Sequence, residues 1–136
     1  MSHAGAQGLM QLMPGTAREQ AGRIGVQYLS ASLTQDSQYN IRLGSSYFQR
    51  MMSSYNSYPL AVAAYNAGPG NVNKWLRQNG DPRTGAVSWI DWIERIPYFE
   101  TKNYVTRVLE NAVVYEAMHP DKAALGRPRT LSEFLR

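Results

Sequence analysis

The sequence predicts an all-α protein, and three observations support this fold class. Apolar residues recur three and four positions apart along much of the chain, as they do on one face of a helix. Few stretches alternate apolar and polar residues for long enough to form a half-buried strand. Proline and glycine stand where these periodic segments begin and end. We therefore expect a series of helices joined by tight turns.

The composition limits the kinds of protein and site that the chain can form. Its 136 residues, 43% of them hydrophobic, suffice for one domain with a real core. No apolar run approaches the roughly 20 residues that cross a bilayer, and the N-terminus lacks the basic and then apolar order of a secretory signal. Without cysteine, and with only two histidines, His3 and His119, we expect no metal site and no cofactor.

The net charge of +4 makes an anionic partner plausible but does not choose one. Basic residues are scattered along the chain and are only slightly denser near the C-terminus. This distribution favours an ordinary solvated surface over a nucleic-acid interface, for which the sequence offers no motif.

The first half of the chain contains four predicted helices. Pro14 can start a short helix that runs to about Gly22, and Asp36 can cap a longer one. On that longer helix a buried stripe is expected from residues at helical spacing, namely Ile41, Gly44, Tyr47, Phe48, Met51, Met52 and Tyr55. The short apolar helix "PLAVAAYNAG" should begin at Pro59 and end at Gly68, and the next should begin at Pro69 and end at Gly80.

The second half starts with a predicted loop over residues 81–85. Ser88 and Asp91 resemble a capping box for the helix "SWIDWIER", which Pro97 should end. The longest helix, "YFETKNYVTRVLENAVVYEAMH", should bury Val105, Val108, Leu109, Ala112 and Val113. Thr130 and Glu133 form a second capping box for a short terminal helix. We accordingly divide the chain into a domain over residues 1–118 and a C-terminal tail over 119–136.

Three clusters place polar groups in apolar surroundings near a turn or a helix end: "GLMQLMP", "AAYNAGPG" and "IPYFETKNYV". Gln11 either bonds the neighbouring backbone or lines a groove, and spacing alone favours the first interpretation. Tyr65 lies among small residues that allow either helix packing or the approach of a ligand. Glu100 stands between aromatic residues, where it can bond its own helix N-terminus or accept sugar hydroxyls while the rings stack on pyranoses.

Together the clusters resemble the catalytic domain of the soluble lytic transglycosylases, which have a goose-type lysozyme-like fold and cleave peptidoglycan. The similar segments are "GAQGLMQLMPGTA", "NIRLGSSYF", "LAVAAYNAGPGNVNKWL" and "WIERIPYFETKNYVTRVL", in that order, and they span nearly all of residues 4–115. Motifs of this length and order are specific, so they reverse the preference for a purely structural Gln11 and Tyr65. The resemblance also implies location in the periplasm or cell envelope.

The resemblance implies roles for particular residues toward glycan strands of alternating GlcNAc and MurNAc. Gln11 and Met13 would line a groove, Tyr65 and Asn66 would lie beside the reacting centre, and Glu100 would contact the sugar. In this family one Glu protonates the glycosidic oxygen, and its carboxylate then helps the muramyl C6 hydroxyl attack C1, which yields a 1,6-anhydro product.

The resemblance also places that acid in a Glu-Ser pair on a helix preceding the Gly-rich turn. Counting back along the family pattern, we expect this pair to lie before Met1, so no residue of the sequence is assigned as the catalytic acid. Three interpretations remain open: a fragment or misplaced start of an active lytic transglycosylase, a module that binds glycan without cleaving it, and, more remotely, a basic nucleic-acid-binding module. The sequence leaves open whether this polypeptide is itself an enzyme, although the resemblance implies a lytic transglycosylase.

Overall fold

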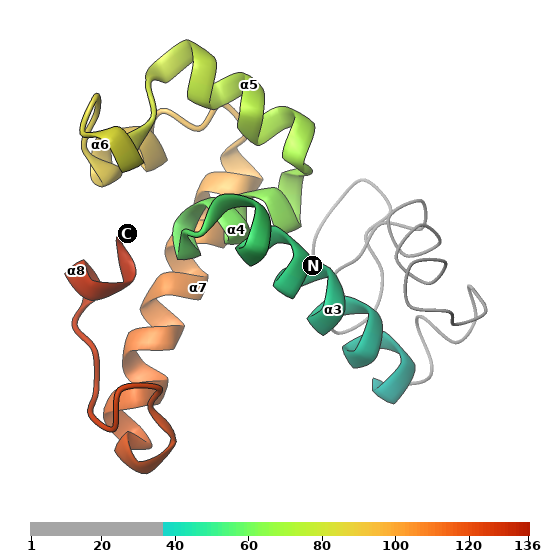
Figure 1. The fold of residues 1–136 in the computed structure, drawn as a ribbon, viewed down its shortest axis with the longest axis vertical. Helices are drawn as coiled ribbons and strands as arrows, with labels where there is room; N and C mark the ends of the chain where they lie inside the picture. Colours follow the sequence, from blue (N-terminus) through green and yellow to red (C-terminus); the bar gives the residue numbers. More distant parts are fainter. Residues whose placement is uncertain (1–36) are drawn as a thin grey trace. The chain divides into compact units, whose positions relative to one another are not determined.

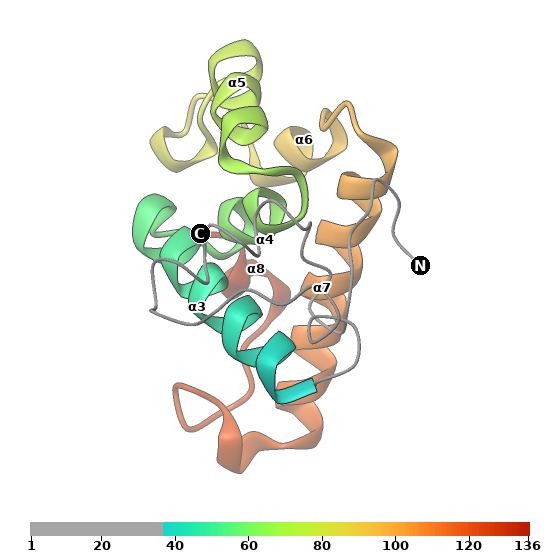
Figure 2. The same cartoon turned by 90° about the vertical axis from the view of Figure 1, so that its right-hand side faces the viewer.

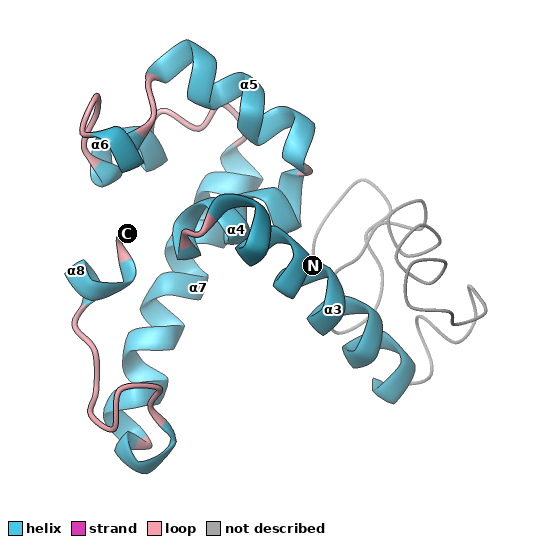
Figure 3. Ribbon diagram, viewed as in Figure 1, coloured by secondary structure: helices cyan, strands magenta, loops and turns pink. Residues whose placement is uncertain are grey.

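A computed structural model of the chain describes residues 37–136, and every regular element in this range is helical, as the sequence predicts (Figure 3). The elements are α3 (Ser37–Tyr55), α4 (Tyr58–Ala67), α5 (Pro69–Asn79), η1 (Pro82–Thr84), α6 (Trp89–Glu94), α7 (Phe99–Met118), η2 (Pro120–Lys122) and α8 (Leu131–Phe134). The helix predicted from Pro14 lies outside the described residues. None of the described helices is long and apolar enough to span a membrane.

The chain divides into two compact units, Met1–Ser54 and Tyr55–Arg136. The described part of the first is α3, whose buried face includes Leu43, Tyr47 and Met51 at intervals of four residues. The predicted stripe is confirmed at four positions, where Gly44, Tyr47, Met51 and Tyr55 are buried, while Phe48 and Met52 are half-buried. Burial of Leu43 was not predicted. Asp36, the predicted cap of this helix, lies outside the described residues.

The second unit is arranged around α4, which packs against both α5 and α7 (Figures 1 and 2). This helix begins at Tyr58, one residue before the predicted start, because the Ser57 hydroxyl accepts a hydrogen bond from the Leu60 N–H at 3.4 Å. All residues from Pro59 to Tyr65 are buried. A short helix that is apolar all round must be covered on every side, so α4 is the central element of this unit.

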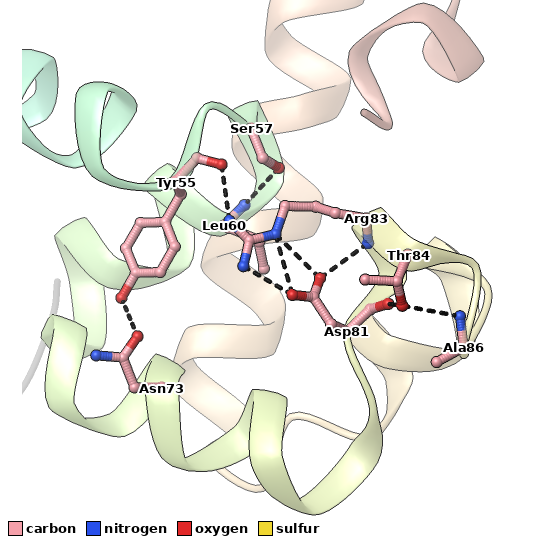
Figure 4. A network of polar contacts seen from close by, with 8 residues as sticks. All are labelled: Tyr55, Ser57, Leu60, Asn73, Asp81, Arg83, Thr84 and Ala86. Carbon is pink, nitrogen blue, oxygen red and sulfur yellow. Dashed lines mark hydrogen bonds and ion pairs between the residues drawn. The ribbon is translucent and has the colours of Figure 1, made fainter.

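Polar contacts of Tyr55 and Arg83 fasten the segments on either side of α5 (Figure 4). The Tyr55 hydroxyl donates to Asn73 Oδ1 at 2.8 Å, and Arg83 Nη1 donates to the Tyr55 carbonyl at 3.0 Å. Asp81 accepts from the Arg83 backbone N–H at 2.9 Å and also pairs with the Arg83 guanidinium. Because Asp81 caps this turn, residues predicted as loop contain the short 3-10 helix η1.

The buried stripe of α7 differs in part from the predicted one. Val105 and Leu109 are buried as predicted, but Val108, Ala112 and Val113 are only half-buried. Instead the buried face extends to Thr101 and Glu116, which are 2% and 7% exposed. A polar side chain in such a position must find a hydrogen-bond partner from another segment, and both do.

The C-terminal tail turns back and runs along α7 to α8 (Figure 1). Arg129 donates to both carboxylate oxygens of Glu116, and its guanidinium lies 4.2 Å from the ring centroid of Phe134. Phe134 is 2% exposed and packs at 5.4 Å from the ring of Tyr58 on α4. The capping box of Thr130 and Glu133 is confirmed. A boundary at residue 118 stays a prediction, although the tail contributes to the core of this unit.

The start of α6 is set by Ser88. The Ser88 hydroxyl accepts from the Asp91 N–H at 3.1 Å and so caps α6 as predicted. The helix ends at Glu94, three residues before Pro97, and its Trp92 and Ile93 are buried. Short helices of this kind depend on the burial of a few side chains, since their own hydrogen bonds are few.

We predict that Phe134→Ala lowers the free energy of unfolding by about 3–5 kcal/mol, because it empties a buried aromatic site and removes the ring beneath Arg129. Chemical denaturation monitored by circular dichroism measures this change. Phe99→Ala is the matched control, because Phe99 is 72% exposed and its removal should leave stability nearly unchanged. Equal effects of the two substitutions would contradict a structural role for the tail.

We also predict that stability declines as the pH falls from 4.5 toward about 2. Hydrogen bonds from Arg127 hold the pKa of Glu133 at about 2, against an ordinary value of 4.5, and Arg129 likewise lowers the pKa of Glu116. A carboxyl whose pKa is lowered by folding stabilises the protein fully above its ordinary pKa and loses this contribution as protonation proceeds. Urea unfolding across this range should show a shallower decline in a Glu116→Gln, Glu133→Gln double variant than in the parent, and equal slopes would refute the assignment.

Candidate functional site

Two of the three predicted clusters meet in the second unit. Asn66, at the end of α4, accepts a hydrogen bond through Oδ1 from the Thr101 hydroxyl at 2.7 Å. Thr101 directly follows Glu100 in the first turn of α7, so residues 35 positions apart become neighbours. The third cluster, with Gln11 and Met13, lies outside the described residues. The candidate site therefore comprises the end of α4, the start of α5 and the start of α7.

The end of α4 is shaped by Gly68. Its N–H donates to the Ala64 carbonyl at 2.8 Å, and its φ of 93° and ψ of 148° lie in a region that is open essentially to glycine alone. This conformation ends α4 and lets Pro69 begin α5 at once. Asn71, in the first turn of α5, donates from Nδ2 to the Ala67 carbonyl at 2.7 Å and closes the turn.

Tyr65 and Asn66 differ in how much of their side chains reach the surface. Tyr65 is 7% exposed, so most of its ring belongs to the core, whereas Asn66 is half-buried. The alanines that precede them, Ala61, Ala63 and Ala64, are fully buried and allow close packing around α4. Asn66 is therefore the more accessible polar group of "AAYNAG".

The start of α7 carries aromatic rings beside a carboxylate. Tyr98 and Phe99 are 50% and 72% exposed, and Glu100, which follows them, is half-buried. A carboxylate in the first turn is stabilised by the positive end of the helix dipole. Burial raises the pKa of Tyr104 above its ordinary value, so the phenol one turn further along stays neutral and can donate a hydrogen bond.

Contacts from α5 hold Tyr98 in place. Its hydroxyl donates to Asn71 Oδ1 in a long hydrogen bond of 3.5 Å, and its ring meets that of the buried Trp75 edge to face at 5.2 Å. Edge-to-face pairs of this kind restrict both rings. Tyr98 is thus held by two residues of α5, while half of its surface stays exposed.

This arrangement suits the binding of a carbohydrate. Exposed rings can stack on the apolar faces of sugar rings, while the carboxylate and the amide exchange hydrogen bonds with hydroxyl and acetamido groups. Within residues 37–136 no group of histidine, aspartate and glutamate side chains could hold a metal ion.

Sequence reasoning missed Thr101, although a signal for it exists. Thr101, Val105 and Leu109 follow one another at intervals of four, which places the threonine on the buried stripe of the helix. A buried hydroxyl needs a partner, and the pattern alone gives no means of choosing Asn66. Asn71 and Trp75 were also not assigned to the site, because their contacts with Tyr98 depend on the turn at Gly68.

Comparison with known proteins identifies the family. The family model described as transglycosylase SLT domain matches residues 1–87. The chain belongs to this family. The soluble lytic murein transglycosylase of Escherichia coli (strain K12) is 37% identical to it over 126 residues, which amount to 91% of this SLT chain and 19% of that protein.

Solved structures agree with this assignment and confirm the predicted lysozyme-like helical fold. The crystal structure of the 70 kDa soluble lytic transglycosylase from Escherichia coli matches 96% of the SLT chain and 20% of its own, at a TM-score of 0.77 and 36% identity. A complex of the 70 kDa soluble lytic transglycosylase with bulgecin A matches 97% and 21%, at a TM-score of 0.78 and 34% identity. The SLT chain thus spans about a fifth of the length of these proteins.

We predict that Gly68→Ala lowers the free energy of unfolding by about 1–3 kcal/mol, because alanine tolerates this backbone conformation poorly. Gly70→Ala is the matched control, since Gly70 lies within α5 and a methyl group there meets open space. The control should leave stability unchanged or raise it slightly. Thermal unfolding of the two variants decides the matter, and similar losses from both would show that the turn does not depend on the Gly68 conformation.

Proposed function

We propose that this SLT domain binds the glycan strands of peptidoglycan at the surface formed by the ends of α4 and α7. The observation that carries the proposal is the hydrogen bond between Asn66 and Thr101, which joins the "AAYNAG" and "IPYFETKNYV" motifs in a member of the SLT family. The Escherichia coli relative is a murein transglycosylase by name, which points to the same polymer.

Each side chain receives a role from its chemistry. Tyr98 and Phe99 stack on sugar rings, Glu100 accepts hydrogen bonds from hydroxyl groups, and Asn66 contacts the sugar beside Tyr65. On the strength of their motif alone, Gln11 and Met13 are also proposed to contact the glycan. The protein would then act where peptidoglycan lies, in the periplasm or cell envelope.

The reaction we propose is cleavage of the β-1,4 bond between MurNAc and GlcNAc without water. The muramyl C6 hydroxyl attacks C1 of the same sugar, the bond to the glycosidic oxygen breaks, and a proton passes to that oxygen, which leaves a 1,6-anhydro end. Since the nucleophile belongs to the substrate, positioning of the sugar supplies much of the rate. Glu100 acts in binding here, and the family resemblance assigns proton transfer to the Glu of a Glu-Ser pair.

Cosedimentation with purified sacculi, followed by chromatography of released muropeptides, tests both parts of the proposal. Binding together with 1,6-anhydro products supports the whole reaction, whereas binding without such products reduces it to a glycan-binding module. Failure to bind sacculi refutes it. Retention on DNA at moderate salt, with none on sacculi, would instead favour the nucleic-acid interpretation.

We predict that Glu100→Gln weakens binding to sacculi about tenfold to a hundredfold, the range expected when a hydrogen bond to a charged group of about 1.5–3 kcal/mol is lost. Glu110→Gln, at an exposed position of the same helix, removes the same charge and serves as the control. Equal affinity of both variants and the parent would exclude Glu100 from the binding surface.

A further inference from the structure

We propose that Thr101 is a positioning residue, which fixes the side-chain amide of Asn66 so that its NH2 group faces the ligand. The inference rests on the proposed glycan binding and adds a hydrogen-bond donor of defined direction to it. Neither the motifs nor the family resemblance singled out Thr101.

The hydroxyl of Thr101 has an unusual partner for a helical threonine. Threonine in a helix commonly bonds a carbonyl one turn earlier, as Thr106 of the same helix does with Lys102 at 3.0 Å. Thr101 stands in the first turn, where the Tyr98 carbonyl already accepts from the Lys102 N–H at 2.9 Å. Its hydroxyl instead reaches α4 and donates to Asn66 Oδ1.

Burial of Thr101 fixes the geometry of its hydrogen bond with Asn66. Thr101 is 2% exposed, so water does not compete for its hydroxyl, and packing fixes its side chain at the contact between α4 and α7. A threonine hydroxyl can donate one hydrogen bond, and the amide oxygen of Asn66 accepts it. An amide whose oxygen is held in this way must direct its NH2 group elsewhere.

The polar group of Asn66 that can still contact a ligand is therefore its side-chain NH2, a hydrogen-bond donor. Within residues 37–136 its Nδ2 forms no hydrogen bond, and the side chain is half-buried, so the NH2 group has access to the surface. It would select an acceptor oxygen of the glycan, and the acetamido carbonyl, which every sugar of the strand carries, is a better acceptor than the hydroxyl groups. The Glu100 carboxylate, one residue before Thr101, offers acceptors only, so the proposed site contains both a donor and an acceptor.

A double-mutant cycle on affinity for tetra-N-acetylchitotetraose, measured by isothermal titration calorimetry, tests the inference. Thr101→Val keeps the shape of the side chain and removes the hydroxyl, and should weaken binding about fivefold to tenfold, the equivalent of one hydrogen bond. In an Asn66→Ala background the same substitution should have no effect, because Thr101 acts through Asn66. Thr101→Ser should restore the affinity, and the control Thr106→Val should leave it unchanged.

Parent-like affinity of Thr101→Val, or an equal loss in the Asn66→Ala background, would overturn the positioning role while leaving glycan binding intact. Absence of binding by the parent chain to both the tetrasaccharide and sacculi would instead refute the proposed function on which the inference rests. If the parent binds sacculi alone, the same cycle is measured by cosedimentation with sacculi. Should Thr101→Val not fold, Asn66→Asp decides the question, since aspartate keeps the acceptor for Thr101 but lacks the NH2 donor. The inference requires weakened binding in that variant, and parent-like binding would overturn it.

Discussion

The close packing of α4 against α7 is the contact on which the second unit and its site depend. Ala61, Ala63 and Ala64 have no exposed surface, and their small side chains allow the helix to be covered on every side. Near the end of α4, Thr101 bonds Asn66, and near its start Tyr58 packs on Phe134 of the tail. Shifting either helix would break contacts at both ends, so the register of the pair is strongly constrained.

Two polar residues on the buried stripe of α7 define this register. Thr101 and Glu116 lie near opposite ends of the helix, and each bonds a side chain from another segment, Asn66 or Arg129. Apolar packing alone tolerates alternative arrangements, whereas a buried polar group is satisfied in few of them. One of these contacts stabilises the fold at the tail, and the other, at the opposite end of α7, involves Asn66 of the proposed site.

The proposed glycan-binding residues stand at helix ends because these positions combine exposure with rigidity. Gly68 ends α4 and Pro69 starts α5, while Tyr55, Asp81 and Arg83 fasten the segments around α5 (Figure 4). Asn71 and Trp75 of α5 in turn hold the ring of Tyr98, just before α7. Preorganised groups of this kind bind a ligand with little further loss of conformational entropy.

Local chemistry determined which segments are helical and where most of them end, because proline, glycine and capping side chains act within a few residues of the chain. The motifs likewise sufficed to assign Tyr65, Asn66 and Glu100 to a glycan site, an assignment that stays a prediction. Only the tertiary structure decided that the Thr101 hydroxyl meets Asn66 and that Arg129 covers Glu116. A periodic pattern marks which face of a helix is buried, but a hydrogen bond to a distant segment depends on the packing of both.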